Sequence, residues 1–202
     1  MDVNLTRALG AVKLAMGDAA NKASNRRLIV LRDRAPCKSG CNGCCSRLIV
    51  LSLAEAALIL EHLEGSGRWK EVKERALVQA KPSQEVAPLA WFKMNIKCPV
   101  LDPTSGECTA YPVRPPVCSA HFVTSNPEVC DPWSTVGGKF EPHDMDDLYA
   151  EFQERLASSV DGFGVMAMRL PLPVALLVAE RVRMKTSLTV EDAISLLYNE
   201  LR

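Results

Sequence analysis

Apolar residues recur at helical spacing over most of this chain, which predicts a protein built mainly from α-helices. The first stripe predicts an amphipathic helix over residues 5–20 that ends near the polar run at 21–27. Its members are Leu5, Ala8, Leu9, Val12, Met16 and Ala19. After residue 143 the helical pattern returns with a stripe of Met145, Leu148, Tyr149, Phe152 and Leu156. Helices are therefore expected on both sides of the middle of the chain.

One helix start is marked by a capping box. The sequence SLAE at 52–55 offers Ser52 as N-cap and Glu55 three positions later, so that each side chain can bond the other residue's backbone N–H. A helix is therefore predicted from 53 to about 64, and Gly65 is expected to end it.

Three further helices are predicted from periodicity. The first covers 67–80, and the polar, proline-bearing stretch at 81–88 after it is expected to be a loop. The second covers 172–184 and is more apolar, and the third begins after Thr189 as its N-cap.

The pentamer RLIVL occurs twice, at 27–31 and 47–51. Its β-branched residues favour short strands, and the two copies bracket four cysteines, so they are candidates for a two-stranded ribbon around a site. Chance similarity between two apolar pentamers is the alternative.

Residues 96–135 have a different character, because they hold four cysteines and seven prolines. Proline at this density excludes long helices. Something other than regular hydrogen-bonded structure must order this segment, and a bound metal would do so.

The eight cysteines fall into two groups of four. The groups are Cys37, Cys41, Cys44 and Cys45, then Cys98, Cys108, Cys118 and Cys130. Four thiolates are the full ligand set of a structural Zn²⁺ or of a [4Fe–4S] cluster. Eight could serve two sites, or one site with reserve cysteines. All eight are candidate metal ligands.

Spacing favours an iron–sulfur cluster over zinc. Zinc ribbons carry two Cys-x2-Cys knuckles, and here only Cys41-x2-Cys44 fits, although Cys118-x2-His121 could supply a mixed one, which makes His121 a further candidate ligand. The spacing Cys37-x3-Cys41-x2-Cys44 occurs in radical S-adenosylmethionine enzymes. Those enzymes need a barrel of alternating strands and helices, which this chain does not show, so radical chemistry is rejected.

Cys44 and Cys45 are neighbours, and neighbouring side chains point to opposite faces of an extended backbone. Cys45 is therefore predicted to face a different ligand set from Cys37, Cys41 and Cys44. A distal cysteine between 98 and 130 would then complete the first group.

Three readings without a metal carry less weight. Disulfides are uncommon in a reducing cytosol, and a thioredoxin-like Cys-x2-Cys belongs to an α/β fold that the sequence does not predict. A catalytic cysteine with His121 as base rests on a lone Cys-x2-His spacing.

Composition limits the setting of this chemistry. The chain has 202 residues, is 48% hydrophobic, and balances 24 basic against 24 acidic residues, so nothing points to nucleic acid. Charged residues and prolines interrupt the most apolar stretch, 165–182, which is too short for a membrane span, and the N-terminus lacks a secretory signal. A cytoplasmic protein is expected, with another protein as a candidate partner.

The cysteine segment resembles the YkgJ-type cysteine-cluster family over roughly residues 35–130. The resemblance is carried by the following stretches: the first cysteine group, CPVLD at 98–102, GECTAY at 106–111 and VRPPVC at 113–118. It implies chelation of zinc or iron by these cysteines. Flagellin lysine N-methylase shares the cluster, so a protein-modifying enzyme is the remaining alternative, although no glycine-rich cofactor turn is present.

The same motifs imply roles for two neighbours. Arg114 would offset thiolate charge or donate hydrogen bonds to sulfur from outside the ligand set, and Tyr111 would pack beside the site. Taken together, the sequence predicts one mainly α domain over 1–202. Helical regions at 1–30 and 136–202 would pack around an irregular metal module at 31–135 with at most short strands.

Overall fold

The computed structural model describes residues 3–31, 40–121, 123, 126–134, 146–160, 164–184 and 189–201. The longer helices are α1 (Val3–Leu31), α2 (Leu53–Gly65), α3 (Trp69–Ala80), α7 (Asp146–Ser159), α8 (Leu172–Met184) and α9 (Val190–Glu200). The shorter helices are α4 (Pro82–Glu85), α5 (Pro88–Lys93) and α6 (Pro116–Ser119). The 3-10 helices are η1 (Gly43–Ser46), η2 (Tyr111–Val113), η3 (Pro127–Cys130) and η4 (Gly164–Ala167), and the strands are β1 (Val50–Ser52) and β2 (Arg169–Pro171).

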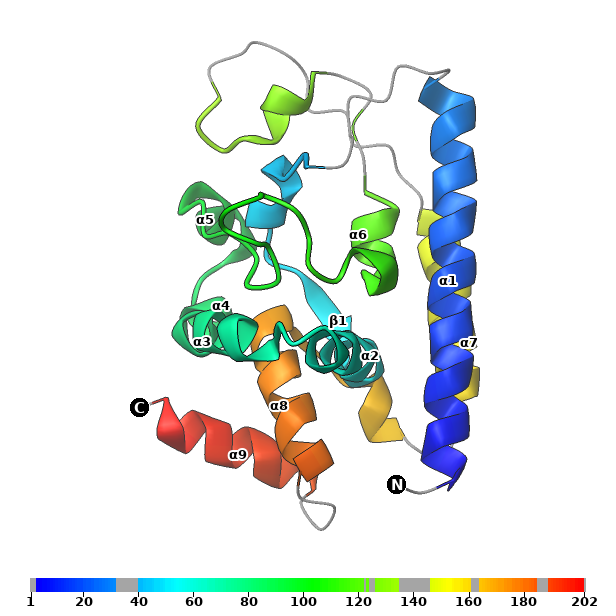
Figure 1. Ribbon diagram of the computed structural model, residues 1–202, viewed down its shortest axis with the longest axis vertical. Helices are drawn as coiled ribbons and strands as arrows, with labels where there is room; N and C mark the ends of the chain where they lie inside the picture. Colours follow the sequence, from blue (N-terminus) through cyan, green and yellow to red (C-terminus); the bar gives the residue numbers. More distant parts are fainter. Residues whose placement is uncertain are drawn as a thin grey trace.

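Helices α2 and α8 form the centre of the molecule (Figure 1). Each follows a strand without an intervening residue, and the two strands pair antiparallel with Leu51 opposite Leu170. Because the strands are antiparallel, α2 and α8 start at opposite ends of this short ribbon, where the N–H of Leu53 donates to the carbonyl of Met168 and that of Leu172 to the carbonyl of Ile49. The start of α2 is fixed further by the predicted capping box, because Ser52 accepts a hydrogen bond from the backbone N–H of Glu55, and the Glu55 carboxylate accepts one from that of Ser52.

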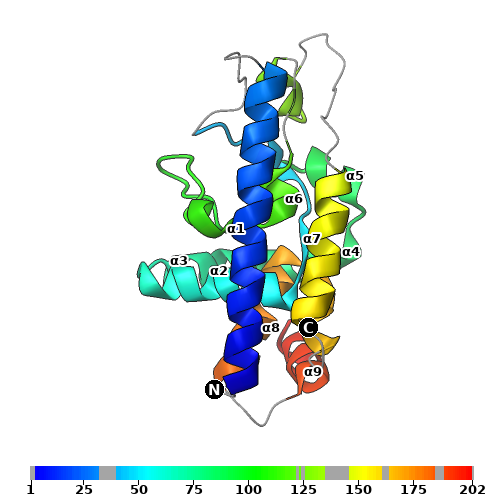
Figure 2. The ribbon, with the colours of Figure 1, turned by 90° about the vertical axis from the view of Figure 1, so that its right-hand side faces the viewer.

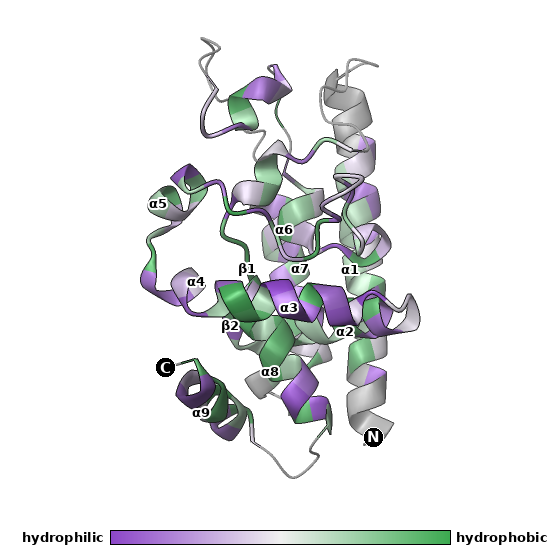
Figure 3. Cartoon of the chain, turned by 60° about the vertical axis from the view of Figure 1, so that its left-hand side comes forward, coloured by the Kyte–Doolittle hydropathy of each residue, from purple (hydrophilic) through white to green (hydrophobic). Residues whose placement is uncertain are grey.

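Helix α1 runs beside α7 along one side of this centre (Figure 2). Val12 and Met16 of α1 and Phe152 and Leu156 of α7 are buried in one hydrophobic core that also includes α2, α3, α8 and α9. Ion pairs join the exposed faces of α1 and α7, and the shortest, between Lys22 and Glu151, measures 2.6 Å. Figure 3 shows α8 apolar except near its C-terminal end, which agrees with its buried position.

The mainly α fold class is confirmed, and three local predictions are wrong. The first helix, expected to end near 21–27, continues as α1 to Leu31. The first RLIVL copy, 27–31, is the last part of α1, and β1 pairs with β2 rather than with that copy, so no ribbon forms around the cysteines. Residues 82–85, expected in a loop, form the short helix α4, which Pro82 begins. None of the described helices has the length and apolar character needed to cross a membrane.

Candidate metal centre

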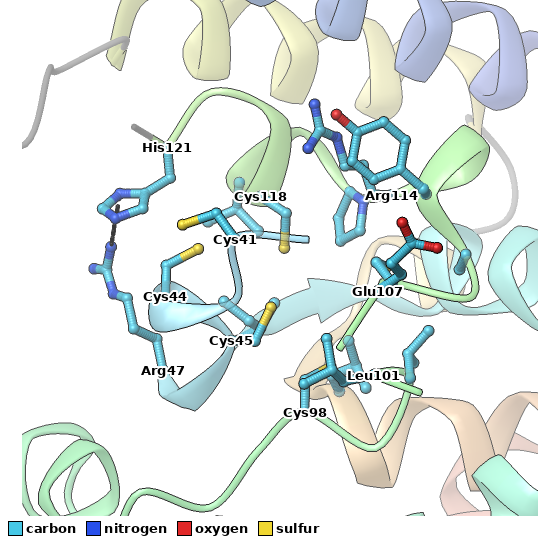
Figure 4. A pocket seen from close by; sticks show the side chains of 18 of the residues that line it. Cys41, Cys44, Cys45, Arg47, Cys98, Leu101, Glu107, Arg114, Cys118 and His121 are labelled. Carbon is cyan, nitrogen blue, oxygen red and sulfur yellow. Dashed lines mark hydrogen bonds between the residues drawn. The ribbon is translucent and has the colours of Figure 1, made fainter. Parts of the chain in front are cut away.

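Seven cysteines from separate parts of the sequence line a single cavity of about 380 Å³ (Figure 4). They are Cys41, Cys44, Cys45, Cys98, Cys108, Cys118 and Cys130. All seven are free thiols. Cys37 lies outside the described residues. The structure therefore brings the distal group to the first group, as the sequence predicts.

Short proline-started helices present the distal cysteines. Pro116 occupies the first turn of α6, which carries Cys118, and Pro127 begins η3, which ends at Cys130. Proline suits a first helical turn because its missing N–H has no partner there and its φ is already helical. The prolines that exclude long helices from this segment thus begin the short helices that place Cys118 and Cys130 at the cavity.

The first cysteine group is tied to the distal segments by contacts that do not involve the thiols. The backbone N–H of Cys98 donates to the carbonyl of Cys45 at 2.7 Å, and the Asn42 amide donates to the carbonyl of Gly106 at 3.3 Å. On the other side, η1 lies against η3 so closely that a Cβ on Gly43 would stand 2.7 Å from the Cβ of Cys130. The cavity is therefore closed by backbone contacts as well as by thiols.

Asp102 shapes the loop that carries Cys98 and Cys108. Its carboxylate accepts hydrogen bonds from the backbone N–H groups of Thr104 at 2.8 Å and Ser105 at 3.0 Å, and these bonds lower its pKa. It also forms an ion pair with Arg68, at the start of α3. The turn allows Leu101 to bridge to Cys108 in antiparallel fashion, which sets the two cysteines on facing strands of the loop.

Cys44 and Cys45 line the same cavity although they are neighbours, and the prediction that Cys45 belongs to a different ligand set from Cys37, Cys41 and Cys44 stays a prediction. The two residues lie in the 3-10 helix η1, where successive side chains are about 120° apart rather than opposite. The Cys45 thiol hydrogen-bonds to Cys44, and this bond, assisted by the charge of Arg47, lowers the pKa of Cys44 to about 6 despite burial. The same bond raises the pKa of Cys45.

The distal thiols are buried, and burial disfavours their charged forms. Burial raises the pKa of Cys98 to about 12, and it raises that of Cys108 and, more strongly, that of Cys118. Cys44 adds to each of these shifts by its charge, which places it close to all three. Without a bound cation these three thiols are neutral at physiological pH.

Two arginines stand at the cavity, and only one was predicted from the sequence. Arg114 is half-buried, lines the cavity and acts by its charge to lower the pKa of Cys44, Cys108 and Cys118. Its guanidinium lies 4.1 Å from the centre of the Tyr111 ring, so Tyr111 packs beside the site. In Figure 4 Arg114 lies across the cavity from Arg47.

Arg47 is the arginine that sequence reasoning missed. Its Nη1 donates to a ring nitrogen of His121 at 2.8 Å, and both side chains line the cavity. The only signal available was a basic residue two positions after the adjacent cysteines. Whether the Arg47 side chain faces the thiols depends on the 3-10 turn of η1, which precedes it.

The thiols surround the cavity without converging on a point. Among the described residues, no three His, Cys, Asp or Glu side chains lie close enough together to share one metal ion. The donor set is nevertheless soft and nearly all sulfur, which suits zinc, copper(I) or iron–sulfur chemistry.

The fold and the donor set define a helical cysteine-cluster protein. Residues 36–132 match the family model CxxCxxCC, described as a putative zinc- or iron-chelating domain. The resemblance predicted from the motifs is thereby confirmed over this segment. The chain matches no curated protein and no solved structure.

Proposed function

We propose that the cysteines around the cavity hold an iron–sulfur cluster, most simply [4Fe–4S], in a structural or redox role. The observation that carries the proposal is the arrangement of seven thiols around one cavity with no three within reach of a single ion. Four thiolates on one Zn²⁺, each at about 2.3 Å, would bring their sulfur atoms within roughly 4 Å of one another. A cluster keeps its thiolates further apart, because irons and sulfides stand between them.

The surroundings also suit a negatively charged cluster. Arg114 and Arg47 both favour the thiolate form of Cys44 by their charge. Charges and hydrogen bonds near the sulfurs, together with burial, are the features by which proteins tune cluster potentials. His121 bonds to Arg47, which supports a cluster held by thiolates alone rather than a mixed Cys/His site.

Zinc remains the second candidate, because the family description names zinc as well as iron. A zinc site would require four of the thiols to move together onto one ion. No observation on the described residues favours protein methylation, and it is not proposed.

Anaerobic purification of the full chain, followed by metal and sulfide analysis and a visible spectrum, tests the proposal. We expect a coloured protein with iron and acid-labile sulfide in equal amounts. Cys98→Ser and Cys118→Ser should lower the iron content severalfold, whereas Ser158→Ala, on the exposed face of α7, should not. A colourless protein with stoichiometric zinc would overturn the cluster in favour of zinc. Protein that holds neither metal would overturn both.

A further inference from the structure

The cavity has a second wall that carries no sulfur. This wall is apolar and comes from the segment that precedes β1 and from α6, with the half-buried Leu48, Ile49 and Val117 as its members. Buried core residues, among them Ile59 and Leu172, lie behind this wall. A volume of about 380 Å³ lies within the range of pockets for small organic ligands. A metal centre on the thiol wall leaves the apolar wall to be covered by something else.

Arg114 is the polar group of this cavity that is free to bind a ligand. Among the described residues, none accepts a hydrogen bond from its guanidinium or forms an ion pair with it. The other cavity arginine, Arg47, is engaged by His121, and Arg68 and Arg75 bind a carboxylate and a carbonyl. Stacking on Tyr111 holds the Arg114 guanidinium in one orientation, which lowers the entropy lost when it binds an anion.

These two features indicate the chemistry of the ligand. A guanidinium with free donors matches the two oxygens of a carboxylate in a bidentate pair. The apolar wall requires a hydrocarbon body attached to that anion. Glu107 lines the same cavity, and its charge disfavours anions that carry more than one negative charge.

We propose that the cavity binds a small organic carboxylate, with its anionic group on Arg114 and its hydrocarbon body against Leu48, Ile49 and Val117. Arg114 then serves two anions, the thiolate-bound centre and the ligand. The inference rests on the proposed function in one respect, because the ligand shares the cavity with the metal centre.

Calorimetric titration of the purified full chain, with its metal content recorded, tests the inference. The probes are acetate, butyrate and hexanoate, with butanol, butylamine and inorganic phosphate as comparisons. We expect the carboxylates to bind saturably and to bind up to about fourfold more tightly for each methylene buried. Butanol, butylamine and phosphate should bind at least tenfold more weakly than butyrate.

Arg114→Met should weaken butyrate binding at least tenfold, and Arg114→Lys should restore only part of it, since lysine lacks the planar fork. Arg183→Met is the matched control, because Arg183 is exposed on α8 and does not line the cavity, and it should change butyrate binding by less than threefold. Circular dichroism confirms that each variant is folded.

The outcomes separate this inference from the metal proposal. It fails if metal-loaded protein binds no carboxylate, if phosphate binds as well as butyrate, or if both arginine variants weaken butyrate equally. It also fails if Arg114→Met loses metal and butyrate binding together, because Arg114 would then act only through the metal centre. Butyrate binding that depends on Arg114 in a chain without metal would uphold the inference and overturn the proposed function.

Discussion

At the residue scale, the site depends as much on small and polar residues as on its thiols. Asn42 and Gly43 separate Cys41 from Cys44, and each makes the contact to a different distal segment. Gly106, which accepts the Asn42 bond, has a φ of +71°, and a Cβ there would meet the Asn42 amide at 2.8 Å. The two residues between Cys41 and Cys44 therefore make the contacts that hold η1 against the distal segments.

Gly43→Ala tests this view of the docking contact. The new Cβ would lie 2.7 Å from the Cβ of Cys130, closer than two carbons can approach, so η1 and η3 must separate. We expect metal content per chain to fall at least twofold, as measured by elemental analysis. The free energy of unfolding should fall by about 1–3 kcal/mol, the usual cost of overpacking.

Gly17→Ala is the matched control for that substitution. Gly17 lies within α1, and a Cβ there would have no neighbour within 4 Å. We expect unchanged metal content and a gain of up to about 1 kcal/mol from higher helix propensity. Normal metal content in Gly43→Ala would show that the close approach of η1 to η3 does not matter for the site.

At the element scale, the parts predicted from sequence are those with local signals. The capping box starts α2 at Leu53, Thr189 caps α9, and α8 occupies 172–184 as its periodicity indicates. The pairing of β1 with β2 joins segments far apart in the sequence, so no local signal reveals it. The β-branched residues of 27–31 continue α1, because a strong helix extends over a weak strand preference.

The site follows the same division. The grouping of the cysteines and the positions of Arg114 and Tyr111 beside them could be predicted from the motifs. The orientation of Cys45 and the position of Arg47 depend on the 3-10 turn of η1. The four residues of this turn, GCCS, carry no pattern that predicts a 3-10 helix.

Helix α3 holds the Cys98 segment by side chains placed along one of its faces. Arg75 Nε donates to the carbonyl of Pro99 at 2.8 Å, and the Gln79 amide donates to that of Lys97 at 2.9 Å. Arg75→Met would leave the carbonyl of the buried Pro99 without this donor. We expect a loss of about 1–3 kcal/mol in urea unfolding and faster transfer of metal to a chelator.

Lys70→Met provides the comparison, because Lys70 is exposed on the same helix. It removes the same charge and should change unfolding by less than about 0.5 kcal/mol. If both variants release metal at the wild-type rate, α3 does not position Cys98.

At the scale of the whole molecule, two parts are stabilised in different ways. The hydrophobic core links α1, α2, α3, α7, α8 and α9, and Cys98 and Cys108 only pack against its edge. In the described part of 96–134, by contrast, no helix exceeds four residues. Metal binding is coupled to folding where a segment has little regular structure of its own. Removal of the metal by a chelator should therefore make the amides of 96–134 exchange faster with solvent, while those of α2 and α8 stay protected.

The stability of the metal-free protein and that of the metal-loaded protein should depend on pH in opposite directions. In metal-free protein, burial raises the pKa of Cys98 from its ordinary 9.0 to about 12, and it raises those of Cys108 and Cys118 as well. Above pH 9 the unfolded chain releases these protons while the folded chain keeps them. The stability contributed by the neutral thiols is thus complete below pH 9 and is lost as pH rises toward 12.

A bound cation reverses the sign for the thiols that hold it. Metal-bound thiolates have a folded pKa below 9.0, so their stabilisation is present at high pH and is lost as protons compete for sulfur at low pH. Urea unfolding of both forms between pH 5 and 10 measures this difference. Metal-free protein whose stability stays constant above pH 9 would show that the distal thiols are not buried. Metal-loaded protein that is as stable at pH 5 as at pH 8 would show that these thiolates do not hold the metal.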